Sequence, residues 1–174
     1  MTATKGAATQ QIGFEPGTVV VAETGGGLFT QELFDGRHRL VADEPSAVGG
    51  NDLGPGPYEL LLMALGACTS MTVRLYAKRK QWPLERIVVR LRHSKIYIED
   101  CENCDTRPAM LDHVVREIEL AGSLSVEQTS KLMEIADKCP VHRTLTHEIK
   151  ITSTLVNGLL PPNFEQVRQE RRKS

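Results

Sequence analysis

Residues 54–68 read GPGPYELLLMALGAC, and this stretch decides how the rest of the chain is organised. Pro57 suits the first turn of a helix, where its missing N–H would have had no intrahelical partner. From Tyr58 to Lys80, apolar residues recur at spacings of three and four, which predicts one long helix. They include Leu60, Leu61, Ala64, Leu65, Cys68 and Met71 or Thr72. Because its first half is apolar all round, we expect that half to be buried on most sides, as the central core helix.

Segments with strand character lie on both sides of this helix, and the sequence predicts a shorter helix after it. Strands are expected over residues 19–21, 28–34, 37–42, 87–98, 114–120 and 149–156. Asp35-Gly36 is a hairpin signal, and Ser125 with Gln128 fits a capping box for a helix that ends at Lys138, before Cys139 and Pro140. The order of the elements predicts an α+β fold rather than a regular βαβ winding.

Length and composition fit a single domain in a reducing compartment. The chain has 174 residues, 40% of them hydrophobic and 25% charged, which is ordinary for a globular protein. We expect a flexible segment over residues 1–16, one domain over 17–157 and a charged tail over 158–174. The net charge of -1 argues against nucleic acid as a partner. With no apolar run long enough for a membrane span and no signal peptide at residues 1–16, we expect a cytoplasmic protein without a membrane partner.

Cysteine chemistry is the main functional question, because free thiols in a reducing compartment either pack in the core or react. Cys68 lies inside the long helix, next to Gly66 and Ala67, which would let another backbone or a small ligand approach closely. Cys139 is expected at a helix C-terminus, where the helix dipole disfavours a thiolate while Lys138, His142 and Arg143 favour one. From the residues alone, each cysteine is either reactive or structural.

The motifs around both cysteines resemble one family. Residues 54–72, with Cys68, look like the central helix of the OsmC/Ohr family (osmotically inducible protein and organic hydroperoxide resistance protein). Ala136-Asp-Lys-Cys139-Pro-Val-His142 looks like its second cysteine motif, and the resemblance extends from about Val19 to Val156. The OsmC-like subgroup is the most similar, through residues 43–45, 79–82 and the acidic loop with Cys101 and Cys104.

The resemblance implies an OsmC-like fold, with antiparallel sheets around a long central helix, in an intertwined homodimer. It also implies a thiol peroxidase without metal or organic cofactor. Cys68 would attack an organic hydroperoxide, and hydrogen peroxide is a further candidate substrate. Cys139 would then condense with the resulting sulfenic acid to form a disulfide, and a dithiol reductant would restore both thiols.

The family also uses an arginine braced by a glutamate to ionise the attacking cysteine, and here the match is imperfect. The family position for the glutamate is Tyr58, with Glu59 one residue late; Glu59 also suits a plain first-turn carboxylate at the helix N-terminus. Arg37 and Arg39 are the candidate arginines, and alternation puts both on one face of their strand. Arg39 matches the OsmC pattern better, although a solvated surface explains either residue equally well.

Two further questions stay open at this level. Cys101 and Cys104 could lie in an ordinary exposed loop, form a local disulfide or auxiliary thiol pair, or bind a metal. For the whole protein, the alternative to a peroxidase is a non-catalytic protein of the same fold that binds a small ligand or senses redox state. No G-x-S-x-G elbow, phosphate loop or dinucleotide fingerprint is present, so other common enzyme classes have no support.

Overall fold

The computed structural model describes residues 17–97 and 110–155. Its elements are β1 (Val20–Glu23), β2 (Gln31–Phe34), β3 (Arg39–Ala42), a 3-10 turn (Ser46–Val48), α1 (Pro57–Arg79), β4 (Leu84–Tyr97), β5 (Met110–Gly122), α2 (Val126–Ala136) and α3 (Pro140–Leu145). All three strand pairings are antiparallel, so the predicted α+β class is confirmed. The expected N-terminal segment, the loop with Cys101 and Cys104, and the tail over 158–174 lie outside the described residues.

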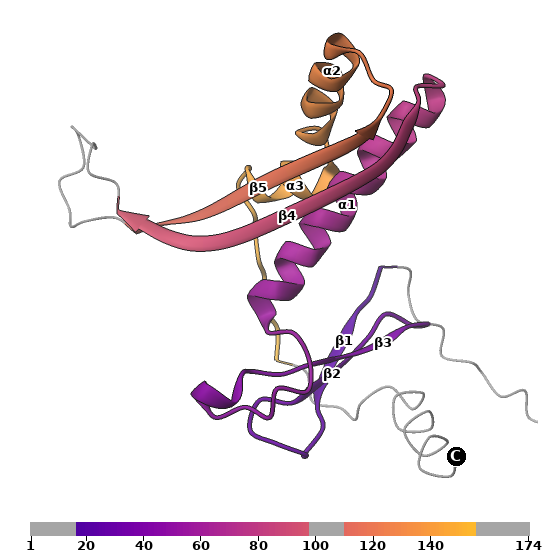
Figure 1. Ribbon diagram of the computed structural model, residues 1–174. Helices are drawn as coiled ribbons and strands as arrows, with labels where there is room; N and C mark the ends of the chain where they lie inside the picture. Colours follow the sequence, from indigo (N-terminus) through magenta and orange to yellow (C-terminus); the bar gives the residue numbers. More distant parts are fainter. Residues whose placement is uncertain (1–16, 98–109, 156–174) are drawn as a thin grey trace, which may run out of the picture.

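The strands form two separate sheets. β1, β2 and β3 make a three-stranded meander, and β4 pairs with β5 in a long hairpin. Figure 1 shows this hairpin running beside α1, with α2 near the C-terminal end of α1 and the small sheet beyond its N-terminal end. The long helix is thus flanked by antiparallel strands, as the sequence predicts.

One stripe of α1 faces the rest of its own chain. The helix begins at Pro57, as predicted, and its buried residues Leu65, Thr69, Val73 and Ala77 recur every four positions. Gly66 is buried beside this stripe. A β-carbon built on Gly66 would lie 2.9 Å from the Cδ1 atom of Leu91, so the glycine lets β4 come close to the helix.

The main hydrophobic core lies between the second half of α1, the hairpin and α2. Its buried members are Val73, Ala77, Leu84, Leu132, Ile135 and Ala136. Complete burial of a side chain such as Leu132 stabilises the fold by about 1.5–3 kcal/mol. The predicted capping box orients α2: the Gln128 backbone N–H donates to Ser125 Oγ, and the Gln128 side chain accepts from the Ser125 N–H. This core fixes the end of α2 and therefore the position of the residues that follow it.

The first half of α1 differs from the expectation, because the described chain does not bury it on most sides. Leu61 is 40% exposed and Met63 is 57% exposed. Contrary to the sequence-based expectation, α1 also has the length and composition of a membrane span, and 22% of its most apolar 18-residue stretch is buried. The small polar residues of α1 interrupt its apolar run in the sequence, but they hardly lower the mean hydropathy of the whole helix. An extended apolar surface of α1 is therefore left uncovered by the described residues.

Three local predictions were wrong. No strand forms over residues 149–155, because alternation alone does not make a strand and no described strand lies beside this segment. The helix α2 ends at Ala136, and Pro140 starts α3 instead of only ending the helix before it. Finally, β3 begins at Arg39, since the Asp35 carboxylate accepts the N–H groups of Arg37 and His38 and holds Arg37 in the turn.

Candidate functional site

The fold brings the two motif cysteines together. Cys68 lies in the middle of α1, and Cys139 lies directly before α3, which packs against α1. Both are free thiols, and their side chains are hydrogen-bonded to each other. Cys139 is fully buried, whereas Cys68 is only partly buried and is therefore the more accessible sulfur. The pair has the arrangement needed for thiol–disulfide chemistry.

Cys139 is the N-cap of α3, which corrects the expectation that it ends a helix. Its Sγ atom accepts the backbone N–H of His142 at 3.5 Å. The first N–H groups of a helix have no intrahelical acceptors, so a sulfur placed there receives donors that favour its charged form. The local helix geometry thus supports a thiolate at Cys139, opposite to the effect expected from a helix C-terminus.

The two thiols differ in the direction of their pKa shifts. Burial raises the pKa of the Cys68 thiol, and so does the hydrogen bond with Cys139. Burial would also raise the pKa of Cys139, but hydrogen bonds from Cys68, the His142 N–H and Thr69 outweigh burial and lower it. The backbone N–H donor at the start of α3 thus favours the charged form of Cys139 over that of Cys68.

Two residues that the sequence reasoning missed connect this pair to the core. Thr69 is fully buried next to Cys68 on α1, and its hydroxyl accepts a hydrogen bond of 3.1 Å from Arg116 Nη1. Arg116 lies on β5, in line with the half-buried Val114 and Ile118. An arginine in the apolar row of an alternating strand was a signal available in the sequence, since such positions normally hold apolar residues.

Glu59 lies on the other face of α1 from Cys68. Cys68 follows Glu59 by nine residues, and at about 100° per residue these rotate the side-chain direction by two and a half turns. Glu59 lines a cavity of about 490 Å³ together with Met63, Gly66 and Ser70, and neither cysteine lines that cavity. At the preceding position, the Tyr58 ring stacks on His93 with 4.4 Å between the ring centroids. Within one chain, the structure does not bring Glu59 to the cysteine pair.

The two candidate arginines belong to the small sheet and its turn. Arg39 on β3 forms an ion pair with Glu32 on β2, and its guanidinium lies 4.3 Å from the centre of the Phe34 ring. Arg37 is exposed in the turn before β3, so the two arginines do not share a strand face as expected. Neither is on an element that packs closely against α1 in the described chain.

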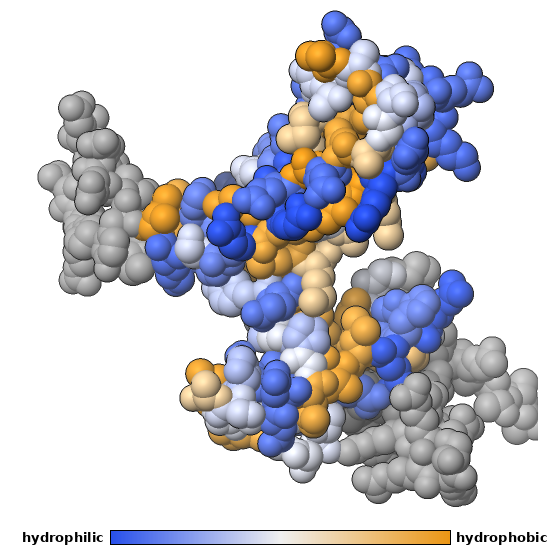
Figure 2. Space-filling view, in the orientation of Figure 1, coloured by the Kyte–Doolittle hydropathy of each residue, from blue (hydrophilic) through white to orange (hydrophobic). Residues whose placement is uncertain are grey.

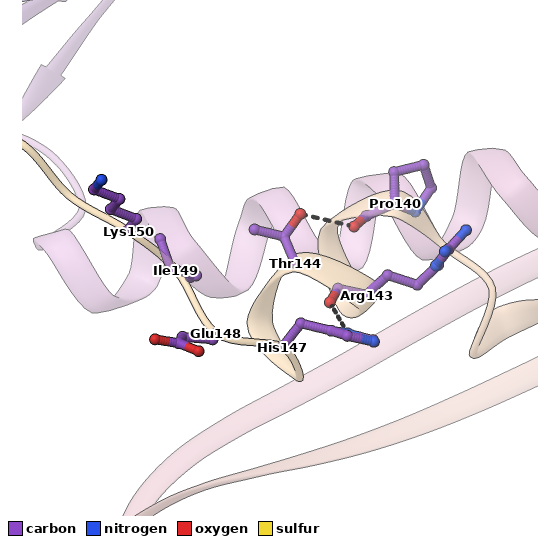
Figure 3. Close-up of a pocket in the computed structure, with 7 residues that line it drawn as sticks. All are labelled: Pro140, Arg143, Thr144, His147, Glu148, Ile149 and Lys150. Atoms are coloured by element: carbon purple, nitrogen blue, oxygen red, sulfur yellow. Dashed lines mark hydrogen bonds between the residues drawn. The ribbon is translucent and has the colours of Figure 1, made fainter.

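Two further cavities lie near the cysteine pair. One of about 270 Å³ lies between α1, β5 and α3 and is lined by Leu65, Asp112, Val114, Arg116, His142, Leu145 and Thr146. Another of about 580 Å³ is formed by α3 and the segment after it, with Pro140, Arg143, Thr144, His147, Glu148, Ile149 and Lys150 around it (Figure 3). Neither sulfur lines these cavities. In the described part of the chain, no group of three or more His, Cys, Asp or Glu side chains could hold a metal ion.

Comparisons with known proteins identify the family of the sequence and similar folds. The sequence model of the family described as OsmC-like protein matches residues 49–154, which include both cysteines. The fold is similar to an OsmC-like protein from Mycoplasma pneumoniae, with a TM-score of 0.55 and 20% identity over 74% of this chain and 84% of that one. It is also similar to an organic hydroperoxide resistance protein from Legionella pneumophila, with a TM-score of 0.54 and 20% identity over 74% and 89%. Among curated proteins, none matches the chain.

The family match extends over more than half of the sequence, so the chain belongs to the OsmC-like family. The low identities to solved structures establish the shared fold and nothing finer. Family membership supports a general peroxidase or stress-response role.

Proposed function

We propose that the protein is a thiol peroxidase that reduces organic hydroperoxides through Cys68 and Cys139. The single observation that supports this most strongly is the direct hydrogen bond between the two thiols, which come from separate elements of the fold. Two thiols in hydrogen-bond contact can form a disulfide with little backbone movement. Family membership and the likeness to a protein named for organic hydroperoxide resistance point to the same chemistry.

The reaction begins at Cys68, which is the more accessible of the two sulfurs. Its proton passes to the Cys139 thiolate as its sulfur attacks the terminal peroxide oxygen. The O–O bond breaks, the leaving alkoxide takes this proton from Cys139 and departs as the alcohol, and Cys68 becomes a sulfenic acid while Cys139 is again a thiolate. Cys139 then attacks the Cys68 sulfur, the S–O bond breaks, and the released hydroxide takes a proton from solvent to form water, so that the disulfide accounts for the two electrons taken by the peroxide.

A dithiol reductant completes the cycle. It attacks the Cys68–Cys139 disulfide, passes through a mixed disulfide and leaves oxidised, with both protein thiols restored. Because Cys139 is fully buried, Cys68 is the sulfur that the reductant reaches first. No metal or organic cofactor takes part in these steps.

The uncovered surface of α1 supports a homodimer with the cysteine pair at its interface. Leu61, Met71 and Leu75 are 40%, 71% and 50% exposed, and they share one helical stripe with Cys68, at successive spacings of seven, three and four residues. Figure 2 shows apolar surface on the part built from α1 and the hairpin and also on the small sheet. A second copy that covers this stripe would also enclose Cys68. Its Arg39 would then supply the cation that the family places beside the attacking cysteine.

A second candidate is a protein that binds a small ligand or senses redox state without turnover. The position of Glu59 favours it, because the family glutamate would have to brace an arginine beside Cys68, and Glu59 lies on the opposite face of α1. In that case the thiols would react slowly or stoichiometrically.

Free-thiol titration tests the proposal directly. The Cys101→Ser/Cys104→Ser variant keeps two of the four cysteines, so every lost thiol comes from Cys68 or Cys139. One equivalent of cumene hydroperoxide should remove both thiols, peptide mapping should find the Cys68–Cys139 disulfide, and a dithiol should restore both. If both thiols survive the peroxide, the peroxidase proposal is rejected.

A further inference from the structure

Arg116 on β5 is connected to the cysteine pair through a partly buried hydrogen-bond path. Its side chain is 13% exposed. The Nη1 atom donates to Thr69 Oγ1 at 3.1 Å and to the Ala136 carbonyl oxygen at 3.3 Å, and Nη2 pairs with Asp137 Oδ1 at 2.5 Å. One guanidinium thus joins α1 to the end of α2, a few residues before Cys139.

Thr69 is the link between Arg116 and the thiols. Because its oxygen accepts a proton from Arg116, its own hydroxyl proton is free to be donated. The side chain of Thr69 is hydrogen-bonded to Cys139, and both residues are fully buried. In a low-dielectric interior such a donor stabilises a negative sulfur more strongly than it would in water.

We propose that Arg116 is a positioning residue that acts through Thr69 to hold Cys139 as the thiolate of the cysteine pair. This inference rests on the proposed peroxidase function for its role in the reaction. Arg116 orients and polarises the Thr69 hydroxyl through the hydrogen bond that it donates. In this role Arg116 acts on Cys139 and not on the peroxide.

Other ionisable groups around Cys139 come from each element that packs against it. Cys68 on α1 donates its S–H, and α3 contributes His142, whose backbone N–H caps the sulfur. At the end of α2, Asp137 binds Arg116 and opposes its charge, although the Asp137 side chain is 63% exposed and so is well screened by water. The direction of the pKa shift at Cys139, below its ordinary value, agrees with a net excess of donors.

The consequence for the reaction is that Cys139 is ready when Cys68 has been oxidised. A thiolate, and not a thiol, attacks the sulfenic sulfur. A Cys139 that remains ionised near neutral pH closes the disulfide before a second peroxide can oxidise the sulfenic acid further. Arg116 and Thr69 would therefore set the pH at which the cycle runs.

The charge of Cys139 can be measured without peroxide. In a Cys68→Ser/Cys101→Ser/Cys104→Ser protein, thiolate absorbance near 240 nm reports Cys139 alone. Thr69→Val keeps the side-chain shape but removes the hydroxyl, and should raise the pKa of Cys139 by about one unit. Thr69→Ser keeps the hydroxyl and should restore the original curve. Arg116→Met should shift the curve in the same direction as Thr69→Val.

Matched variants separate this effect from a loss of packing. Asp137→Asn removes the charge that opposes Arg116, so the pKa of Cys139 should fall. Arg90→Met removes an exposed ion pair on the same hairpin, with Glu119, and should leave the curve in place. If Arg116→Met does not fold, Thr69→Val and Asp137→Asn still give shifts of opposite sign.

The same variants are then tested in the protein with all four cysteines. The pH profile of peroxide consumption should move to higher pH in Thr69→Val and return in Thr69→Ser, with the rate at high pH unchanged. The inference is overturned if Thr69→Val leaves the Cys139 titration in place or if Thr69→Ser does not restore it. A wild-type protein that consumes no peroxide would instead count against the proposed function, while the titration still decides the role of Arg116.

Discussion

The backbone N–H of His142 lies 3.5 Å from the Sγ atom of Cys139, so the sulfur that the proposed reaction uses is also the cap of α3. The same side chain therefore has a structural and a chemical role. Serine is a good N-cap residue and alanine is a poor one, which lets substitutions separate the two roles.

We expect Cys139→Ser to be more stable than Cys139→Ala by about 1 kcal/mol, because the serine oxygen can accept the His142 N–H and alanine cannot. Urea unfolding of the two variants, followed by circular dichroism, measures the difference. An alanine variant as stable as the serine variant would mean that the cap contributes nothing to the fold.

Cys139→Ser should also uncouple the two steps of the peroxidase cycle. Cys68 can still be oxidised, but no second thiol is present to displace the sulfenic oxygen. One equivalent of peroxide should be consumed and dimedone should label Cys68, while turnover with a dithiol stops. The Cys101→Ser/Cys104→Ser protein serves as the cycling control. Normal cycling of Cys139→Ser with a dithiol would show that Cys139 has no resolving role.

Cys68→Ser should abolish peroxide consumption altogether, since a serine hydroxyl is a far weaker nucleophile than a thiol toward an O–O bond. The measurement is the loss of hydroperoxide over time at equal protein concentration, compared with the Cys101→Ser/Cys104→Ser control. Full residual activity would reject the assignment of Cys68 as the attacking residue.

Met71→Glu should weaken the proposed homodimer. Met71 is 71% exposed in the stripe of α1 that contains Cys68, and burying a methionine in an interface is worth about 1.5–3 kcal/mol. Its loss, with a charge in its place, should raise the dissociation constant about tenfold or more. Light scattering over a dilution series measures this effect.

Val126→Glu is the matched control for Met71→Glu, because Val126 is 82% exposed at the start of α2, away from the Cys68 stripe. Its dissociation constant should equal that of the wild type. A wild-type chain that is monomeric at every concentration, or a Met71→Glu variant that dimerises normally, would contradict an interface on this stripe.

Local features were predicted well from the sequence. Pro57 and the apolar spacing located α1, Ser125 with Gln128 located the start of α2, and Asp35-Gly36 located a hairpin turn. Each of these features depends on residues within a few positions of one another, because helix ends and tight turns are determined by local backbone and side-chain interactions. The segment over 149–155 shows the limit, because a strand also needs a neighbour that its own sequence does not specify.

The sequence by itself determined the long helix, the fold class and the two cysteine motifs. Only the tertiary structure decided that the two thiols meet, that Cys139 starts a helix and that Arg116 donates a hydrogen bond to Thr69. The physical reason is that helix and turn preferences act between near neighbours in the chain. The charge on a sulfur depends on donors from distant segments, which only the packed core brings together.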